Sequence, residues 1–226
     1  MGELLNAIIP GVVARSDQFW KACLQTLQMV GIVGVLAVLI GIPFGVLLYT
    51  TKQGGILQNR PIHFVLNKVC DIFRSIPFIL LAAILLGLSR LVVGTAIGVK
   101  GAVIPLTFAT VPFLGRQIEG ALAEVPAGLL EAGESMGCSP WELITRVYLK
   151  EAIPGIARGV TITLISLINF TAIAGVLGAG GLGNFAIQYG HAKDLPDVMW
   201  TVLVIIIVMV SLVQAIGNWV VKKTSH

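Results

Sequence analysis

Long apolar stretches separated by short polar segments dominate the chain. A helix needs roughly 20 mainly apolar residues to cross about 30 Å of hydrocarbon. The third stretch contains Pro105 and Pro112, which are expected to break it, and the second belongs to a longer helix that is expected to bend near Pro77. The pattern predicts an all-α polytopic membrane protein with five transmembrane helices, at about 24–49, 74–90, 96–115, 159–178 and 198–221.

The composition excludes an ordinary soluble domain. Of the 226 residues, 56% are hydrophobic and 12% are charged, and the mean hydropathy is +0.94. A soluble domain carries about 25% charged residues, whereas a disordered chain combines low hydrophobicity with high net charge. The net charge of +4 includes no basic run longer than Lys222-Lys223, so it does not indicate nucleic-acid binding. The three cysteines, which are far apart, predict neither a disulfide framework nor a metal cluster.

The distribution of Lys and Arg predicts the orientation of the five spans. Cytoplasmic loops retain positive charge, so the side with more of these residues is expected to be the cytoplasm. This places the N-terminus outside and the C-terminus in the cytoplasm. The cytoplasmic side then carries ten basic residues: Lys52, Arg60, Lys68, Arg74, Arg116, Arg146, Lys150, Arg158, Lys222 and Lys223. The other side carries five: Arg15, Lys21, Arg90, Lys100 and Lys193.

Residues 116–158 form the longest polar segment, which is expected to be a cytoplasmic loop. Pro126 is suited to the first position of a helix, and Gly137 to the turn after its last residue. Ser139 and Glu142 then have the spacing of a capping box at the start of a second helix. The loop is therefore predicted to fold as helix, glycine turn and helix.

The same spacing allows two other interpretations of this hairpin. An amphipathic hairpin that rests on the membrane surface fits the spacing equally well. A helix-turn-helix DNA reader does not fit, because residues 119–151 contain six acidic and two basic side chains, and contact with phosphates needs the opposite sign.

The same loop resembles the EAA loop of ABC-importer permeases. In that family the pattern is Glu-Ala-Ala, three residues, Gly, nine residues, Ile, one residue and Leu-Pro. The corresponding residues are Glu131-Ala132-Gly133, then Gly137, then Val147-Tyr148-Leu149-Lys150. The departures from the pattern are Gly133 for Ala, Val147 for Ile and Lys150 for Pro.

Further segments extend the resemblance over most of the chain. Residues 73–79, 93–98, 178–183 and 188–190 are similar to the small five-span permeases of methionine importers. The resemblance implies a permease subunit that forms the translocation path for an amino acid, with methionine (L- or D-) as the expected substrate. A permease for another small amino acid or analogue, and a self-sufficient secondary carrier, remain alternatives.

The resemblance also implies a location and a set of partners. Residues 1–226 would form a single transmembrane permease domain of a type I importer in the bacterial cytoplasmic (inner) membrane. Its partners would be a second copy of the chain, two ATP-binding-cassette ATPase subunits, an extracytoplasmic substrate-binding protein and membrane lipid, with no nucleic acid. The chain would be no enzyme and would hold no metal or cofactor, because ATP and Mg would bind to the ATPase. The sequence contains no G-x-x-x-x-G-K-[ST] phosphate loop of its own.

In such importers each permease loop would place a helix in a groove of one ATPase subunit. Small side chains would allow close backbone approach, leucines would supply an apolar anchor, and a glutamate would meet a basic group on the groove rim. The residues assigned to this contact are Leu129, Leu130, Glu131, Ala132, Gly133 and Gly137.

The fourth predicted span carries polar side chains where a translocation path could run. Hydrogen bonds between helices, worth about 0.6 kcal/mol each, are the other explanation. By resemblance, Ile173 falls at the position of an apolar gate residue, so Asn169, Thr171 and Ile173 are the candidate path residues. The full polar set is Thr161, Thr163, Ser166, Asn169 and Thr171.

Two further patterns are expected to be structural. Gly178, Gly180 and Gly183 satisfy G-x-G-x-x-G, but an apolar helix precedes them instead of the strand of a dinucleotide-binding unit, so a tight outer turn is expected. Asp71 and Arg74 are three residues apart and are expected to form an ion pair on one helix face. No charged residue falls near the centre of a span, which disfavours a proton relay and an intramembrane enzyme.

Overall fold

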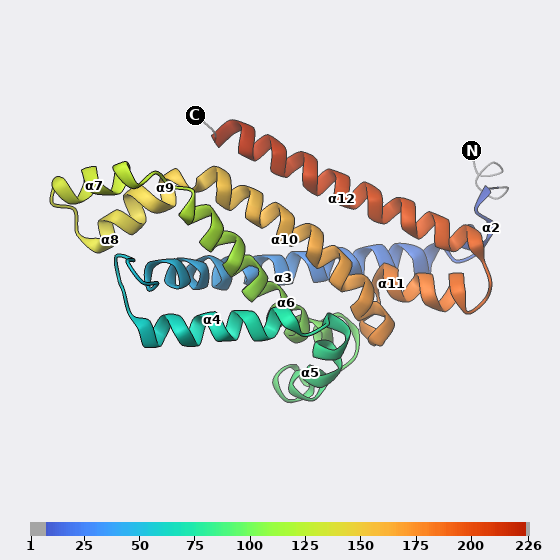
Figure 1. Cartoon of the computed structure of the whole chain (residues 1–226). Coiled ribbons are helices and arrows are strands. Elements are labelled where there is room, and N and C mark those ends of the chain that lie inside the picture. The colour runs from blue at the N-terminus through green and yellow to red at the C-terminus, as the bar shows by residue number, and fades with distance from the viewer. Residues whose placement is uncertain (1–7, 225–226) are drawn as a thin grey trace. The chain divides into compact units, whose positions relative to one another are not determined.

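The computed structural model describes residues 8–224, and its regular elements in that range are all helical (Figure 1). The all-α prediction is therefore confirmed for these residues. The elements labelled η are π-helical. In chain order the elements are α2 (Pro10–Val13), α3 (Ser16–Thr50), α4 (Arg60–Ser75), α5 (Phe78–Val93), α6 (Gly98–Ala123), α7 (Ala127–Ser135), α8 (Pro140–Glu142), η1 (Leu143–Tyr148), α9 (Leu149–Glu151), α10 (Ile153–Ala174), η2 (Gly175–Ala179), α11 (Gly181–Phe185), η3 (Ala186–His191) and α12 (Pro196–Thr224).

Four helical segments are long and apolar enough to cross a membrane: α3, α6, α10 with η2, and α12. The helices α4 and α5 meet the same criterion together, as one bent pair. The described residues thus supply up to five spans, in agreement with the sequence pattern. At 1.5 Å per residue, the 35 residues of α3 extend over about 52 Å, well beyond the hydrocarbon core.

The predicted bend near Pro77 is a complete break. The helix α4 ends at Ser75, and α5 begins at Phe78. Between them Pro77 adopts φ −53° and ψ 131°, outside the helical region. Proline disfavours a helical conformation for the residue before it and has no N–H to donate, which explains why the helix stops at this point.

The third predicted span is longer than its sequence pattern indicated. Pro105 and Pro112 lie inside α6, which continues to Ala123 instead of ending at residue 115. Proline is tolerated in membrane helices because neighbouring groups satisfy the freed backbone positions. Arg116, expected to be the first residue of the loop, therefore lies on the helix.

The chain divides into two compact units. Unit 1 comprises Met1–Val35, Ile76–Ala109 and Leu164–Val213, and unit 2 comprises Leu36–Ser75, Thr110–Thr163 and Gln214–His226. The helices α3, α6, α10 and α12 each contribute residues to both units. The described part of unit 1 contains two apolar clusters, which include Met29 with Leu106 and Phe19 with Val198. Unit 2 contains a cluster that includes Leu114 and Tyr148.

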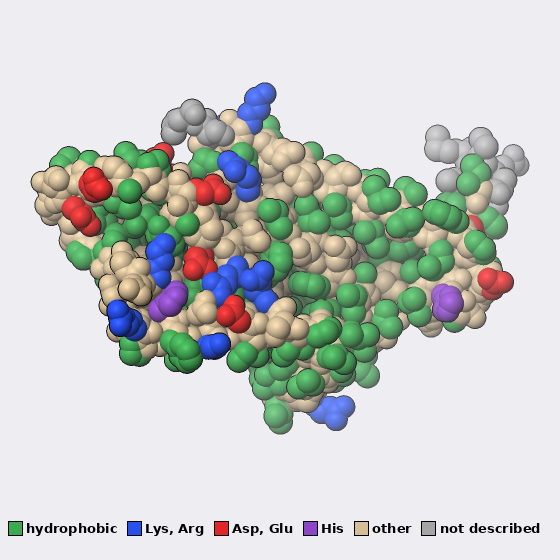
Figure 2. All heavy atoms as spheres, in the orientation of Figure 1, with side chains coloured by type: hydrophobic (Ala, Val, Ile, Leu, Met, Phe, Trp, Pro, Cys, Tyr) green, Lys and Arg blue, Asp and Glu red, His purple; other side chains and the backbone are tan. Residues whose placement is uncertain are grey.

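Charge and apolar surface are distributed unevenly. On the face drawn in Figure 2, acidic and basic side chains gather over α4 and over α7–α9, which are elements of unit 2. The helix α12 instead exposes large apolar side chains along its length, from Met199 and Trp200 to Ile216 and Trp219. An apolar surface of this extent is typical of a chain that contacts lipid or other membrane helices.

Candidate functional site

A left-handed glycine ends α7, the first helix of the hairpin. Gly137 has a φ of +80°, and its N–H donates to the carbonyl of Glu134 at 2.9 Å. The N–H of Cys138 donates to the carbonyl of Gly133 at 3.1 Å. These two bonds constitute a Schellman motif, so the prediction that Gly137 caps the helix is confirmed. Pro126 was expected at the first helical position, but it lies at the N-cap, with ψ 130°, one position before the first residue of α7.

A capping box begins the second helix of the hairpin. The N–H of Ser139 donates to Oε2 of Glu142 at 3.0 Å, and the N–H of Glu142 donates to Oγ of Ser139 at 3.4 Å. The predicted capping box is therefore confirmed. The N–H and the hydroxyl of Ser139, which donates to the same Oε2 at 2.9 Å, lower the pKa of Glu142, and Arg146 at 3.3 Å lowers it further.

Gly133 lies where the two helical arms of the hairpin contact each other. It is buried, and a Cβ at this position would lie 2.6 Å from Cδ2 of Leu143 on η1. The departure from the family's alanine thus lets α7 lie close to the second helix. Leu130 also faces inward, where it packs against the apolar cluster of unit 2.

The opposite face of α7 has no partner within the described chain. Leu129, Ala132 and Met136 follow the i, i+3, i+7 spacing of one helix face, and all three are exposed. Leu129 is 42% exposed, whereas Met136 is 76% exposed. Glu131 and Gly137 are exposed as well. Of the six residues predicted to contact a partner, the exposed ones are therefore Leu129, Glu131, Ala132 and Gly137.

Two exposed apolar side chains beside the glycine turn were missed by the sequence interpretation. Met136 precedes Gly137, and Trp141 lies in α8 with 72% of its surface exposed. The signal for them was available, because a turn usually carries polar side chains and these two are large and apolar. We call the exposed set of Leu129, Glu131, Ala132, Met136, Gly137 and Trp141 the coupling surface.

The base of the hairpin is attached to α3 through two tyrosines. Tyr148 of η1 is buried and packs edge to face against Tyr49, with ring centroids 5.3 Å apart. Burial raises the pKa of Tyr148, and a hydrogen bond with Tyr49 raises it further. The phenol therefore stays neutral, and the hairpin has a buried aromatic anchor within unit 2.

Arg116 joins α6 to α4 through an ionic cluster. Its Nη2 donates to Oδ1 of Asp71 at 2.6 Å and to Oδ1 of Asn67 at 2.5 Å, and its Nη1 donates to Oε2 of Glu119 at 2.6 Å. The predicted Asp71–Arg74 pair is wrong. Because α6 extends past residue 115, it presents Arg116 to Asp71, and the planar guanidinium can bond several oxygens at once. The cluster lies near the end of α6 that leads into the hairpin.

The predicted path residues do not all lie together. Asn169 and Ile173 are four residues apart on one face of α10, and both are exposed, Ile173 to 36%. Ile173 lines an almost wholly apolar hollow of about 330 Å³ within unit 1, together with Val176 and Leu203. Thr171 is instead buried, and its hydroxyl donates to the carbonyl of Ile168 at 2.7 Å.

The other threonines of α10 also bond to their own helix. The hydroxyl of Thr161 donates to the carbonyl of Ala157, and that of Thr163 to the carbonyl of Gly159, both at 2.7 Å. Such back-bonding satisfies a hydroxyl without a second helix. These two side chains are therefore explained neither by interhelical hydrogen bonds nor by a polar path.

The glycine-rich segment after α10 forms a turn with three left-handed residues. Gly178, Gly180 and Gly181 have φ values of +93°, +80° and +79°. The helical elements α10 and η2 precede this segment, so the dinucleotide-binding interpretation fails and the expected tight turn is confirmed.

The helical spans and the acidic hairpin indicate a membrane protein rather than a soluble or DNA-binding protein. Residues 41–226 match the family described as "Binding-protein-dependent transport system inner membrane component". The match covers most of the chain, so the chain belongs to this family. Its members are inner-membrane transport components and not enzymes.

Relatives of known name are similar over nearly the whole chain. The probable D-methionine transport system permease protein MetI of Vibrio cholerae is 44% identical over 222 residues, which are 98% of each chain. Its Haemophilus influenzae counterpart is 44% identical over 192 residues, 85% of this chain and 90% of the relative. A solved structure of the MetNI methionine ABC transporter, described as inward facing, matches with a TM-score of 0.90 and 40% identity, covering 96% of this chain and 99% of that one.

Proposed function

We propose that this chain is the permease subunit of an ATP-driven importer and that its substrate is methionine. Two copies of the chain would form the translocation path between them. The similarity to methionine permeases over 98% of the chain supports the substrate. The uncovered coupling surface, on a hairpin whose first helix ends in a hydrogen-bonded glycine turn, is the observation that carries the mechanism.

The coupling surface would sit in a groove on an ATP-binding-cassette subunit. Its apolar side chains provide the burial that such a contact needs, and the acidic excess of the loop favours a groove with basic groups on its rim. Two ATPase subunits would bind ATP and Mg, and this chain would hold neither. Closure of the ATPases would move the hairpins and, through their helical connections, the spans.

The helix order supports a topology once the hairpin is placed in the cytoplasm. The spans α10 and α12 follow the hairpin, so two crossings leave the C-terminus in the cytoplasm. The first three spans precede it, so the N-terminus lies outside. An extracytoplasmic binding protein would then deliver substrate to the end of α3 near its N-terminus, in the inner membrane of a bacterium.

Asn169 and Ile173 are proposed to line the path where the two copies meet. Both side chains lie on the exposed face of α10, and Ile173 lines the apolar hollow. An apolar constriction excludes water and ions while a substrate with an apolar side chain can pass, which suits a gate.

Reconstitution tests the proposal directly. The permease and its ATPase are placed in proteoliposomes, with the binding protein and radiolabelled methionine outside. We expect accumulation that needs ATP and all three components, with competition by unlabelled methionine. Transport by the permease alone would instead establish the secondary-carrier alternative, and preferential competition by another amino acid would replace methionine as the substrate.

A further inference from the structure

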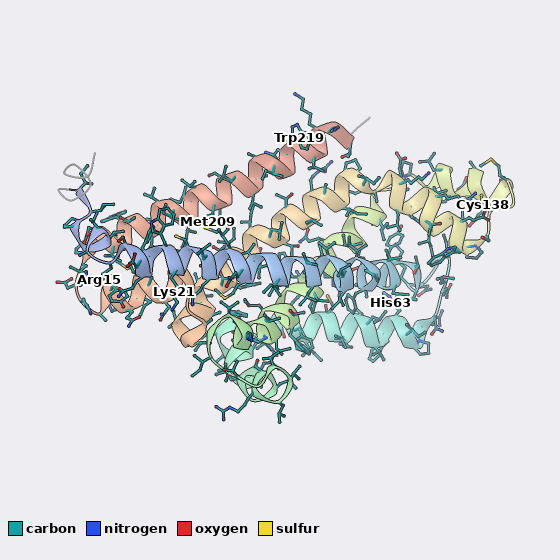
Figure 3. The ribbon with its side chains drawn as sticks, turned by 180° about the vertical axis from the view of Figure 1, so that it is seen from behind. Arg15, Lys21, His63, Cys138, Met209 and Trp219 are labelled. Atoms are coloured by element: carbon teal, nitrogen blue, oxygen red, sulfur yellow. The ribbon has the colours of Figure 1, made fainter. Side chains whose placement is uncertain are left out.

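A partly polar cavity of about 220 Å³ lies within unit 1, and none of the candidate path residues lines it. It is lined by the first turns of α3 and by residues of α11 and η3. Figure 3 labels Lys21 on the wall that α3 contributes. By the volume that water occupies in the liquid, the cavity corresponds to about seven water molecules. This is a suitable size for one small amino acid.

The glycine-rich turn shapes one wall of this cavity and is fixed in place by α3. The N–H of Gly181 donates to Oε1 of Gln25 at 2.9 Å, and the N–H of Leu182 donates to Oγ1 of Thr26 at 2.9 Å. A Cβ on Gly180 would lie 2.6 Å from Oε1 of Gln25. The glycines therefore bring the backbone next to Gln25, and the wall is preorganised. The G-x-G-x-x-G segment thus has a use that the path and the hairpin do not explain.

The cavity has the charge pattern of a site for a carboxylate. Lys21 is exposed and forms no ion pair within the described residues, and none of the ten lining residues is acidic. Two more cations lie close, because Arg15 and Lys193 sit over the ring of Tyr189 at 5.4 Å and 4.9 Å from its centroid. Asp197 also belongs to unit 1, but its carboxylate is engaged by the N–H of Gly11.

The rest of the lining suits the remainder of an amino acid. Four primary amides face the cavity, from Gln18, Gln25, Asn184 and Gln188. Gln25 uses its oxygen on Gly181, which leaves its NH₂ group to donate. Asn184 donates to Oε1 of Gln188 at 3.5 Å, and the oxygens of Gln18 and Asn184 can accept from an ammonium group. The rings of Phe185 and Tyr189, 5.0 Å apart, provide apolar surface for a side chain.

We propose that this cavity binds a zwitterionic amino acid before it enters the path. The carboxylate would bond Lys21, the ammonium group would bond amide oxygens, and an apolar side chain would lie against the two rings. The assignment of the ligand to methionine and of the cavity to the outer face rests on the proposed function. The cavity would act as a receiving site after release from the binding protein.

Photo-crosslinking tests this site. The complex of permease and ATPase, in nanodiscs without binding protein or nucleotide, is illuminated with a diazirine analogue of methionine, and labelled peptides are identified by mass spectrometry. We expect label in peptides that contain residues 18–25 or 184–189.

Labelling should fall about tenfold in Lys21→Gln, because a hydrogen bond to a charged group is lost. The matched control is Lys100→Gln, which removes an exposed cation outside the cavity and should keep full labelling. Methioninol, which lacks the carboxylate, should fail to compete.

Three results would overturn the proposal. Label that maps only to other segments excludes the cavity, and equal labelling in both variants excludes Lys21 as the carboxylate partner. Weaker docking of the binding protein to Lys21→Gln, with methionine labelling unchanged, would make the cavity a socket for an acidic side chain of that protein. ATP-dependent uptake by the unaltered complex, measured separately, shows whether the proposed function holds when the cavity proposal does not.

Discussion

Two glycine turns reverse the chain, and they are constrained in different ways. Gly137 in the hairpin of unit 2 has open space around the position of a Cβ, so only its φ of +80° requires glycine. In the turn of unit 1, a Cβ on Gly181 would lie 2.8 Å from Oγ1 of Thr26, and one on Gly183 would overlap the carbonyl oxygen of Ala172. The first turn is set by backbone conformation, and the second by packing as well.

The two turns show that a glycine can serve either to keep a surface open or to allow close packing. At Gly137 the missing side chain leaves open space within the coupling surface. At Gly181 it lets the turn approach the side chains of α3 in the wall of the cavity, and at Gly183 it lets α11 approach the backbone of α10. Substitutions should therefore separate loss of coupling from loss of folding.

The largest effect is expected for Gly183→Ala. The new Cβ would meet a backbone oxygen, which cannot rotate away, so overpacking of about 3 kcal/mol is expected. Gly178→Ala is the matched control, because its nearest neighbour would be 4.0 Å away and only the left-handed φ opposes it, at about 1–2 kcal/mol. Thermal unfolding of the detergent-purified permease measures both. A control that unfolds as early as Gly183→Ala would show that conformation, and not packing, dominates this turn.

Gly137→Arg is expected to retain folding and lose transport. The position is open, so the side chain fits, but it adds bulk and positive charge to the coupling surface. Uptake into proteoliposomes should fall at least about tenfold, while the amount of inserted protein stays unchanged. Gly137→Asn is the control, since asparagine tolerates the left-handed region. Normal uptake by a stably inserted Gly137→Arg protein would contradict the placement of this turn at an ATPase.

Unit 2 also contains two arginines with acidic partners, and these differ in how far the arginine is exposed. Arg116 is 19% exposed in its cluster, so Arg116→Gln leaves Asp71 and Glu119 without a cation, and we expect a loss of about 2 kcal/mol. Arg146 is 71% exposed beside Glu142, so Arg146→Gln should cost less than about 1 kcal/mol. Thermal unfolding of both variants decides the order. Equal losses would show that the partial burial of Arg116 and Glu119 adds nothing to the strength of the cluster.

Cysteine accessibility distinguishes the two candidate path positions in unit 1. In a background without Cys23, Cys70 and Cys138, Ile173→Cys should react with an aqueous thiol reagent in at least one nucleotide state of the complex. Thr171→Cys should stay protected, because its parent side chain is buried. An Ile173→Cys that is unreactive in every state would remove Ile173 from the path.

The smallest effect concerns the capping box. Ser139→Ala should destabilise the hairpin by about 1 kcal/mol. The lowered pKa of Glu142 means that its contribution is fully present at neutral pH and declines as the pH falls through and below the ordinary glutamate range. Hydrogen exchange of the α8 amides at pH 7 and pH 4 measures both changes. The Ser139→Ala variant should show less pH dependence than the unaltered hairpin, and an unchanged dependence would remove the capping box as its source.

Local hydrogen-bonding signals made the hairpin predictable from the sequence. Gly137, Ser139 and Glu142 each satisfy a backbone or capping requirement within a few residues, so spacing alone placed them. The five spans were predictable for a similar reason, because their apolar length is a property of each segment. Arg116 was misplaced because α6 continues through two prolines, and its partner Asp71 lies 45 residues away in the sequence.

The path and the cavity depend on tertiary contacts that spacing does not contain. Thr161, Thr163 and Thr171 are alike in sequence, and only the structure shows that each bonds its own helix. Leu129 and Leu130 are neighbours, yet one is exposed and the other packs inside unit 2. The cavity combines the start of α3 with a turn more than 150 residues later, a proximity that a single sequence does not reveal.

The π-helical segment η1 sets the rotational phase between the hairpin and the span that follows it. A π turn accommodates one residue more than an α-helical turn, and each residue of an α-helix advances the direction of side chains by about 100°. Removing one residue between Leu143 and Tyr148 would let that stretch wind as ordinary α-helix through the same rotation, so Trp141 and the rest of the coupling surface would keep their direction relative to α9. Removing one residue from ordinary α-helix would instead turn everything before it by about 100°. The π turn is therefore a place where the hairpin can lose a residue and still present the same face.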